Sequence, residues 1–252
     1  MRKEHKGVQP WPAHAALSHH QTNTAASDKQ DKQRAKRPGD MQMQQTHTVS
    51  GNTTWEAASM ISTLQKVEGR GASSDLLASL GTERLWLRCV QPEDAAQVSR
   101  LMTPAISRWV ASWPVPFTPE MAAERIAAAR KAAGMGRLLP FAIERRFDGV
   151  LLGWISVTRN AKDDRRGELG YWLGEEHHGC GYMREAAAVV VAAAFDRLGL
   201  EVIEVGAQPG NVDAFAVLRG CGMASTGGRT VFAPARGHDE LYLFYETARP
   251  NG

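Results

Sequence analysis

The feature that most constrains the fold is a run of nine alanines and valines at residues 186–194. On a helix these side chains are apolar on every side, so the helix must be packed over most of its surface. The run is far shorter than the roughly 20 residues that cross a bilayer. Residues 167–173 before it and 201–207 after it read as strands, the first with alternating side chains. The sequence therefore predicts a strand–loop–helix–strand unit whose helix is buried on a sheet.

Strands and helices are also expected on both sides of this unit. Residues 82–88 alternate as a strand, and residues 140–145 and 150–157 predict two strands joined at Asp148-Gly149. Pro92 suits the first position of a helix, and Thr118 suits the N-cap of another that ends at Gly134. A short helix at 213–219 and a strand at 239–247 complete the expected elements. Several antiparallel strands with flanking helices predict a mixed α+β fold from Thr82 onward.

Residues 1–75 have a different composition, rich in Gln, Thr, Ser, His and Lys and poor in Leu, Ile, Val and Phe. Such a segment buries too little apolar surface to offset its ordering entropy, so we expect a disordered N-terminal extension. It does not resemble a signal peptide, because no apolar stretch follows its first charges. Its first 40 residues carry eight basic and four acidic groups, which suggests a weak nucleic-acid tether. A solvated tail, or an extension read from an upstream start, is the preferred interpretation.

Charge and cysteine content limit the partners and the compartment. The 30 Lys and Arg residues against 27 Asp and Glu leave a net charge of +3, which does not argue for nucleic acid as a partner. Cys89, Cys180 and Cys221 cannot make a disulfide framework and suit a reducing cytosol. We therefore expect a cytoplasmic protein with no membrane partner that acts as a monomer or a homodimer.

The loop before the apolar helix contains Gly179 and Gly181. Glycines let a ligand approach the backbone, and free amides at a helix N-terminus form an anion site. The loop is not a P-loop, since no Gly-Lys-Ser/Thr follows, and Arg184 stands where a Rossmann fingerprint needs glycine. The alternative is an ordinary glycine turn. His177, His178 and Cys180 do not predict a metal site, because neighbouring side chains on a turn diverge and no second ligand pair follows.

Two segments carry a resemblance to a known family. Residues 167–186, Gly-Glu-Leu-Gly-Tyr-Trp-Leu-Gly-Glu-Glu-His-His-Gly-Cys-Gly-Tyr-Met-Arg-Glu-Ala, resemble the acetyl-CoA signature of the GNAT acetyltransferase superfamily. Within it they are most similar to the RimJ/RimL-like group, which includes ribosomal-protein N-terminal-alanine acetyltransferases. Residues 211–223 resemble the family's Asn-x-x-Ser helix with its Gly-aromatic end, although Ala214 replaces the serine and Met223 the aromatic residue. The resemblance covers residues 80–248.

The resemblance implies a GNAT-like, mostly antiparallel sheet that is splayed at the cofactor site, between the strand ending at Leu173 and the strand from Glu201. It also implies acetyl-CoA as co-substrate and no metal. Pantetheine would pair with backbone near Trp172 and Leu173, and Asn211 would contact it. The pyrophosphate would lie on the amides of His178, Gly179, Cys180, Gly181, Tyr182 and Met183.

The implied function is acetyl transfer to a primary amine, and we expect the acceptor to be a protein N-terminal α-amine. A small-molecule amine is an alternative acceptor. A catalytically silent acyl-CoA-binding regulatory module on the same fold is an alternative of another class.

For the reaction we expect Glu168 as the base and the backbone N–H near Leu173 as the oxyanion donor. Strand alternation puts Glu168 on one face with Gly170 and Trp172, towards the cleft. The alternative is a structural carboxylate paired with an arginine such as Arg166. A modest base suffices for an N-terminal amine, whose pKa lies near ~8 against ~10.4 for lysine.

Two further expectations concern the leaving thiolate and the acceptor pocket. Ala214 offers no hydroxyl, so solvent is expected to protonate the thiolate. Trp109, Trp113 and Phe117 are expected either to line the acceptor pocket or to pack in the core.

Overall fold

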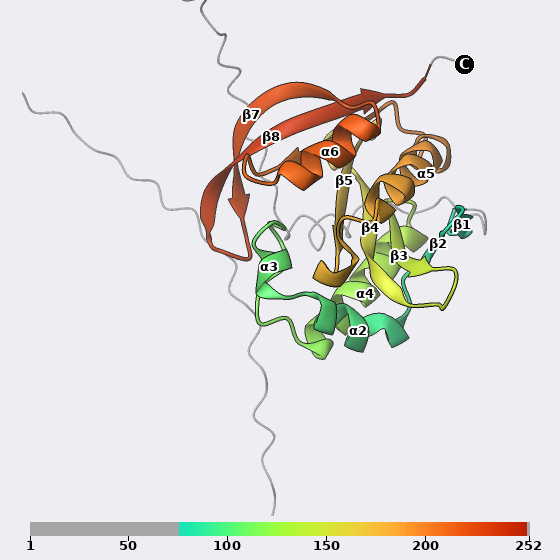
Figure 1. The fold of residues 1–252 in the computed structure, drawn as a ribbon. Coiled ribbons are helices and arrows are strands. Elements are labelled where there is room, and N and C mark those ends of the chain that lie inside the picture. Colours follow the sequence, from blue (N-terminus) through green and yellow to red (C-terminus); the bar gives the residue numbers. More distant parts are fainter. Residues whose placement is uncertain (1–75, 251–252) are drawn as a thin grey trace, which may run out of the picture. The chain divides into compact units, whose positions relative to one another are not determined.

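One sheet organises the computed structural model, which describes residues 76–250 (Figure 1). The expected disordered extension, residues 1–75, lies outside the described residues. Within them the sheet has eight strands in the order β1-β2-β3-β4-β5-β6-β8-β7. Neighbouring strands are antiparallel except for β5 and β6. The strands are β1 (Leu80–Gly81), β2 (Leu85–Cys89), β3 (Leu138–Arg145), β4 (Leu151–Arg159), β5 (Arg166–Leu173), β6 (Val202–Ala207), β7 (Ala224–Ala233) and β8 (His238–Ala248).

Helices cover both faces of this sheet. The helices are α2 (Ala95–Leu101), α3 (Pro104–Ser107), α4 (Pro119–Gly134), α5 (Tyr182–Arg197) and α6 (Val212–Gly220), with 3-10 turns η2 (Pro92–Asp94) and η3 (Glu175–His177). On one face α5 and α6 pack with the strands around Phe141 and Ile155. On the other face α2 and α4 pack around Ala142 and Trp154. Because both faces are buried, β3 reads as a continuous apolar run rather than as an alternating one. The mixed α+β fold with a mostly antiparallel sheet is confirmed.

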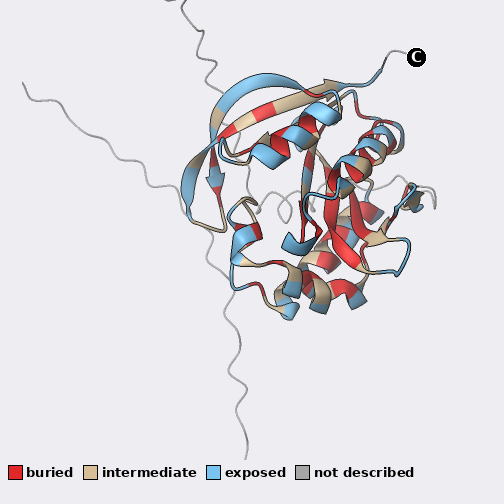
Figure 2. Cartoon of the chain, in the orientation of Figure 1, coloured by how far each residue is buried: buried red, intermediate tan, exposed pale blue. Residues whose placement is uncertain are grey.

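Helix α5 confirms the prediction from its apolar run. Its exposed residues form one narrow stripe at every fourth position, Arg184, Ala188, Ala192 and Asp196. The remaining side chains are buried or partly buried against the sheet, which Figure 2 shows as red and tan on this helix. The helix therefore has one solvent-facing edge and is otherwise part of the core.

Local signals also set the start of α4. The hydroxyl of Thr118 accepts a hydrogen bond from the Met121 N–H at 3.3 Å, and Pro119 is the first helical residue. The helix ends at Gly134, as predicted.

Several elements differ from the sequence expectations. Strand β7 was not anticipated, because most of its residues are exposed and its register shifts between Ser225 and Gly227, so no apolar alternation marks it. The short helix α3 was also missed. The first long strand begins at Leu85 rather than at residue 82, since Thr82 closes a turn through its N–H to the Leu85 carbonyl.

None of the helices within residues 76–250 combines the length and the apolar character that a membrane crossing requires.

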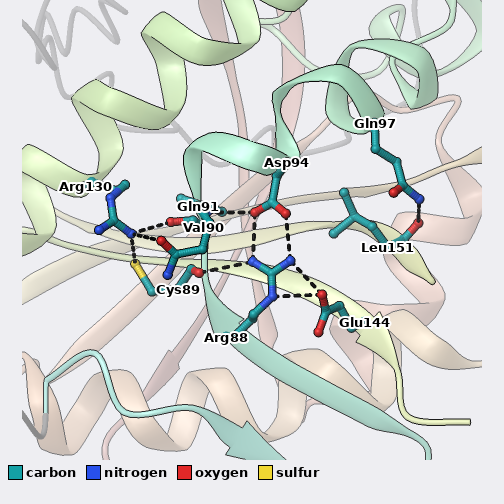
Figure 3. A network of polar contacts seen from close by, with 9 residues as sticks. All are labelled: Arg88, Cys89, Val90, Gln91, Asp94, Gln97, Arg130, Glu144 and Leu151. Atoms are coloured by element: carbon teal, nitrogen blue, oxygen red, sulfur yellow. Dashed lines mark hydrogen bonds and ion pairs between the residues drawn. The ribbon is translucent and has the colours of Figure 1, made fainter. Parts of the chain in front are cut away.

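A charged network joins β2 to the first helical turn (Figure 3). Asp94 is buried and accepts hydrogen bonds from Arg88 at 2.6 and 2.8 Å, and from the Gln91 N–H at 2.7 Å. Arg88 also donates to Glu144 on β3 at 2.8 Å. These hydrogen bonds, chiefly those that Arg88 donates to Asp94, raise the pKa of Arg88 above its ordinary value. The network fixes how η2 and α2 leave the sheet.

We expect Asp94→Ala to lower the free energy of unfolding by about 2–4 kcal/mol, because it removes the main partner of a partly buried guanidinium. Glu201→Ala is the control, since it breaks an exposed pair with Arg165, whose side chain is 72% exposed, and should cost less than about 1 kcal/mol. Urea unfolding measures both. Equal losses would show that the Arg88 network contributes no more than a surface ion pair.

Candidate functional site

The site is built around a split in the sheet. Strands β5 and β6 pair through only three residue pairs, the last of which is Glu168 with Glu204. Beyond it β5 runs on to Leu173 and β6 to Ala207 without pairing. The implied splaying is therefore present, and it leaves one edge of β5 without a neighbouring strand.

Backbone groups of β5 line that edge. The Gly174 N–H donates to the Leu152 carbonyl on β4 at 2.9 Å. Since hydrogen-bonding direction alternates along an antiparallel pair, the Leu173 N–H is directed away from β4, towards the edge that β6 has left. Trp172 lies opposite Trp154 in the β4–β5 register. The Leu173 N–H thus has the direction expected for an oxyanion donor.

The loop after β5 is held at this edge. The His178 ring lies 3.0 Å from the Leu173 carbonyl, Nε2 to O. Gly179 and Gly181 have φ values of 73° and 76°, a left-handed conformation that favours glycine. Gly181 is the N-cap of α5, a helix of 16 residues. Backbone amides and the positive helix end therefore meet at Cys180, Gly181 and Tyr182, which is the geometry of an anion site.

An arginine that the sequence did not single out reaches the same loop. Arg84 donates to the Cys180 carbonyl at 2.9 Å, and pairs with Glu185 of α5 at 2.7 Å. Its guanidinium lies 4.8 Å from the centre of the Tyr182 ring. Arg84 therefore ties the loop to the segment before β2 and adds a positive charge beside the anion site.

An open hollow of about 620 Å³ adjoins the loop. Its lining includes Arg84, Arg145, Arg146, Phe147 and Tyr182. Phe147 is 94% exposed at the turn between β3 and β4. The hollow thus offers cations and an aromatic surface next to the amides of the loop.

Helix α6 begins on the far side of the split. The Asn211 side-chain oxygen caps this helix by accepting from the Ala214 N–H at 3.1 Å. The Tyr171 hydroxyl on β5 lies 3.4 Å from the Ala214 carbonyl. Burial raises the pKa of Tyr171 well above its ordinary value, with a further contribution from Cys221. A hydroxyl from β5 therefore lies beside the position where the family's serine is replaced by Ala214.

Glu168 lies on the opposite face of β5 from Tyr171. It shares its face with Trp172, which packs against Trp113 with ring centres 5.2 Å apart. Burial raises the pKa of Glu168 to about 7, Glu204 adds to the increase, and Arg229 opposes it. Arg166, the suggested partner in the structural alternative, instead pairs with Glu246 at 2.7 Å. Glu168 therefore has the protonation equilibrium of a base near neutral pH.

The aromatic residues before α4 separate into two groups. Trp113 and Phe117 are buried in the core, so they pack rather than line a pocket. Trp109 is partly exposed and lies close to Gly210, where an added Cβ would be 3.5 Å from the indole.

The turn between β7 and β8 holds the segment around Trp109. Arg236 donates to the Ser107 carbonyl at 2.9 Å, and the Ala235 N–H donates to the Ala111 carbonyl at 2.9 Å. This hairpin and the loop after α3 therefore form one wall on the face of Glu168 and Glu204, as the neighbouring positions of α3 and the hairpin tip in Figure 1 also show.

Across residues 76–250, no group of three or more His, Cys, Asp or Glu side chains is arranged to hold a metal ion. The three cysteines are free, and the Cys180 thiol is exposed with its sulfur 3.5 Å from the His178 carbonyl.

Sequence reasoning predicted the loop, Leu173, Asn211 and Glu168 as site residues, and the structure places them along one split. It missed Arg84, Tyr171 and the charged neighbours of Glu168, because each is brought to the site by pairing between distant segments. Tyr171 carried one usable signal, since it lies within the motif that resembles the acetyl-CoA signature.

Comparison with known proteins agrees with this architecture. The family model of the acetyltransferase (GNAT) domain matches residues 84–224. The chain is 25% identical over 150 residues to YdaF of Bacillus subtilis, provisionally described as a ribosomal N-acetyltransferase, covering 58% of this chain and 80% of that protein. It is 26% identical over 171 residues to the N-acetyltransferase p20 of Bacillus licheniformis, covering 67% and 95%. Among solved structures, Mycobacterium smegmatis RimJ in complex with CoA-disulfide superposes with a TM-score of 0.61 at 25% identity, covering 68% and 88%.

The family model spans more than half of the chain and includes the split, the loop and α6, and the relatives it matches are N-acetyltransferases. The chain therefore belongs to the GNAT family and is an N-acetyltransferase.

Proposed function

We propose that this enzyme transfers the acetyl group of acetyl-CoA to the α-amine at a protein N-terminus. The observation that carries the proposal is the split itself, with an anion site and a directed N–H at its edge and a carboxylate on the opposite face. The acceptor class is supported by the 25% identity with RimJ and with YdaF, the latter described as ribosomal.

The residues at the split fit acetyl-CoA. The amides of His178, Gly179, Cys180, Gly181, Tyr182 and Met183 would hold the pyrophosphate. Arg84 and the neighbouring hollow would add cations for the phosphorylated ribose. Pantetheine would follow the free edge of β5 near Trp172 and Leu173. Because the Asn211 oxygen already caps α6, its contact with pantetheine would come from the amide nitrogen.

When bound, acetyl-CoA supplies an acyl group activated as a thioester. The Leu173 N–H would donate to the thioester oxygen as negative charge develops there. Glu168 would accept the proton of the amine. Glu168 and Leu173 are five residues apart on the strand, which separates them by about 16 Å. This distance exceeds the reach of one glutamate side chain, so the proton would pass from the amine to Glu168 through water.

The leaving thiolate also needs a proton. Tyr171 replaces solvent as our preferred donor, because its hydroxyl lies beside Ala214 at the split. The hydroxyl is protonated throughout the neutral range, and the proton that it would pass to the thiolate would be replaced from solvent.

Thiol release from acetyl-CoA tests the function. The acceptors are peptides with a free N-terminal amine, the same peptides with that amine blocked but a lysine retained, a polyamine, an aminoglycoside and free amino acids. We expect release with the free N-termini and none with the blocked ones. Release only with small amines would replace the acceptor class. CoA binding with no release from any acceptor would favour a silent regulatory module.

Gly181→Asp provides the cofactor control for the same assay. It places a carboxylate at the anion site, so we expect CoA affinity by calorimetry to fall at least about tenfold. Gly136→Asp is the matched variant, because Gly136 has a similar φ of 69° and open space around it, and it should leave affinity unchanged. Unchanged affinity in Gly181→Asp would remove the pyrophosphate from this loop.

Glu168→Gln should lower kcat/KM at pH 7 by about 10²–10⁴, the usual worth of a general base, with CoA affinity unchanged. In the wild type the carboxylate form increases as pH rises through about 7, so activity should increase over the same interval. Raising the pH deprotonates the acceptor and should partly rescue the variant. Full activity of the variant at pH 7 would return Glu168 to a structural role.

The thermal stability of Glu168→Gln tests the raised pKa of Glu168 without any measurement of activity. The pKa of Glu168 is higher in the folded than in the unfolded protein. Its contribution to the free energy of unfolding is therefore fully present below its unfolded pKa and is lost as pH rises through about 7. The variant should therefore have a higher Tm than the wild type at pH 8, and the difference should be smaller at pH 4.

Tyr171→Phe should lower kcat about tenfold or more with KM nearly unchanged, because it removes the proton donor and keeps the ring. Tyr245→Phe is the control. Tyr245 packs on Phe215 of α6, the helix that Tyr171 contacts at Ala214, with ring centres 5.6 Å apart. Steady-state kinetics measures both. An unchanged kcat in Tyr171→Phe would leave protonation of the thiolate to solvent.

A further inference from the structure

Three glutamates lie side by side across the sheet at the base of the split. Glu168 on β5 is in register with Glu204 on β6, and Glu204 is in register with Glu246 on β8. Residues in register on neighbouring strands share a face, and their backbones are about 4.8 Å apart. The row therefore brings three carboxylates onto the face that Glu168 occupies.

Two arginines neutralise part of this row. Arg229 on β7 donates to both oxygens of Glu204, at 2.5 and 3.0 Å. Arg166 on β5 pairs with Glu246 at 2.7 Å. Among residues 76–250, no hydrogen bond or ion pair joins the carboxylate of Glu168 to another side chain. The row thus leaves the carboxylate nearest the split without a bonded cation.

Packing holds Arg229 in this arrangement. Its guanidinium carbon lies 3.3 Å from the centre of the Phe244 ring. The Phe244 ring covers Gly206 of β6, where an added Cβ would lie 2.7 Å from the ring. Gly206 shares a face with Glu204, two residues earlier on the same strand. The absence of a side chain at Gly206 therefore lets the ring lie where it supports the Arg229–Glu204 pair.

We propose that Glu204 and Arg229 are positioning residues that together set the proton affinity of Glu168 for its role as base. Glu204 repels the ionised form of Glu168, and Arg229 favours it and also prevents Glu204 from competing for the proton. In the reaction Glu168 takes a proton from the amine, through water, and later returns it to solvent. The inference rests on the proposed role of Glu168, whereas the charge arrangement is independent of it.

The strands bring four charged groups near Glu168, and the wall on this face adds Arg125, Arg236 and Glu240 further from it. The four groups are Arg166 on its own strand, Glu204 on β6, Arg229 on β7 and Glu246 on β8. Strand β4 contributes the uncharged Thr158 opposite Glu168. Burial is the largest cause of the raised pKa of Glu168, and Glu204 and Arg229 act on it with opposite signs. Removing either partner should therefore move the titration in a characteristic direction.

The experiment uses Glu204→Gln and Arg229→Gln in the full chain, with glutamate carboxyls labelled with carbon-13 and assigned by Glu168→Gln. Glu204→Gln should lower the titration midpoint of Glu168 by about one pH unit, and Arg229→Gln should raise it by about one. The acidic limb of kcat/KM should move with the midpoint, so that Arg229→Gln loses about tenfold in kcat/KM below pH 6. Arg229→Lys should restore most of this loss.

Arg165→Gln is the matched control, because it breaks an exposed ion pair with Glu201 just before the same two strands. This variant should change neither the titration midpoint of Glu168 nor the acidic limb of the kcat/KM profile. Midpoints that stay unchanged, or that move in the same direction in both variants, would overturn the inference. Midpoints that move oppositely while the activity limb stays fixed would uphold the charge arrangement and overturn the assignment of Glu168 as base.

Discussion

The separation of β5 from β6 is the constraint on which the site depends. These strands form the parallel pair of an otherwise antiparallel sheet, and parallel neighbours need a crossover, here the helix α5. Because α5 is buried on nearly all sides, it holds the two strands together at one end while they diverge at the other. The divergence frees a backbone edge, and the same crossover places the N-terminus of α5 at its end. One connection therefore creates both the strand edge and the helix N-terminus of the proposed cofactor site.

Side chains of β5 alternate between the two faces of the sheet, which places the proposed catalytic groups on different sides. Tyr171 faces the helices α5 and α6, Glu168 and Trp172 face the opposite side, and the Leu173 N–H lies in the plane between them. The proposed proton donor, base and oxyanion donor thus come from one strand, and the base would act at a distance, through water. The arrangement costs stability, since the carboxylate of Glu168 is partly buried without a bonded cation.

Local signals in the sequence predicted much of this fold and part of the site. Thr118, Pro119 and Gly134 bound α4 through capping chemistry, and the Ala and Val run identified α5 as a buried crossover. Alternation placed Glu168 and Trp172 together, because strand period is a local property. Strand β7 gave no such signal, since it is largely exposed and irregular. The contacts of Arg84 with Cys180, Tyr171 with Ala214 and Arg229 with Glu204 depend on which strands become neighbours, which no single segment encodes.

The place of β8 in the sheet has a consequence for how the enzyme is made. It is the last strand in the chain but lies between β6 and β7, so β7 cannot join the sheet during synthesis until β8 has left the ribosome. Until then Glu204 lacks Arg229, and the loop after α3 lacks Arg236. The segment from β2 to α6, which contains the split and the loop before α5, can pack earlier. A nascent chain would therefore form the split between β5 and β6 before it forms the wall on the face of Glu168 and before Glu204 gains its arginine.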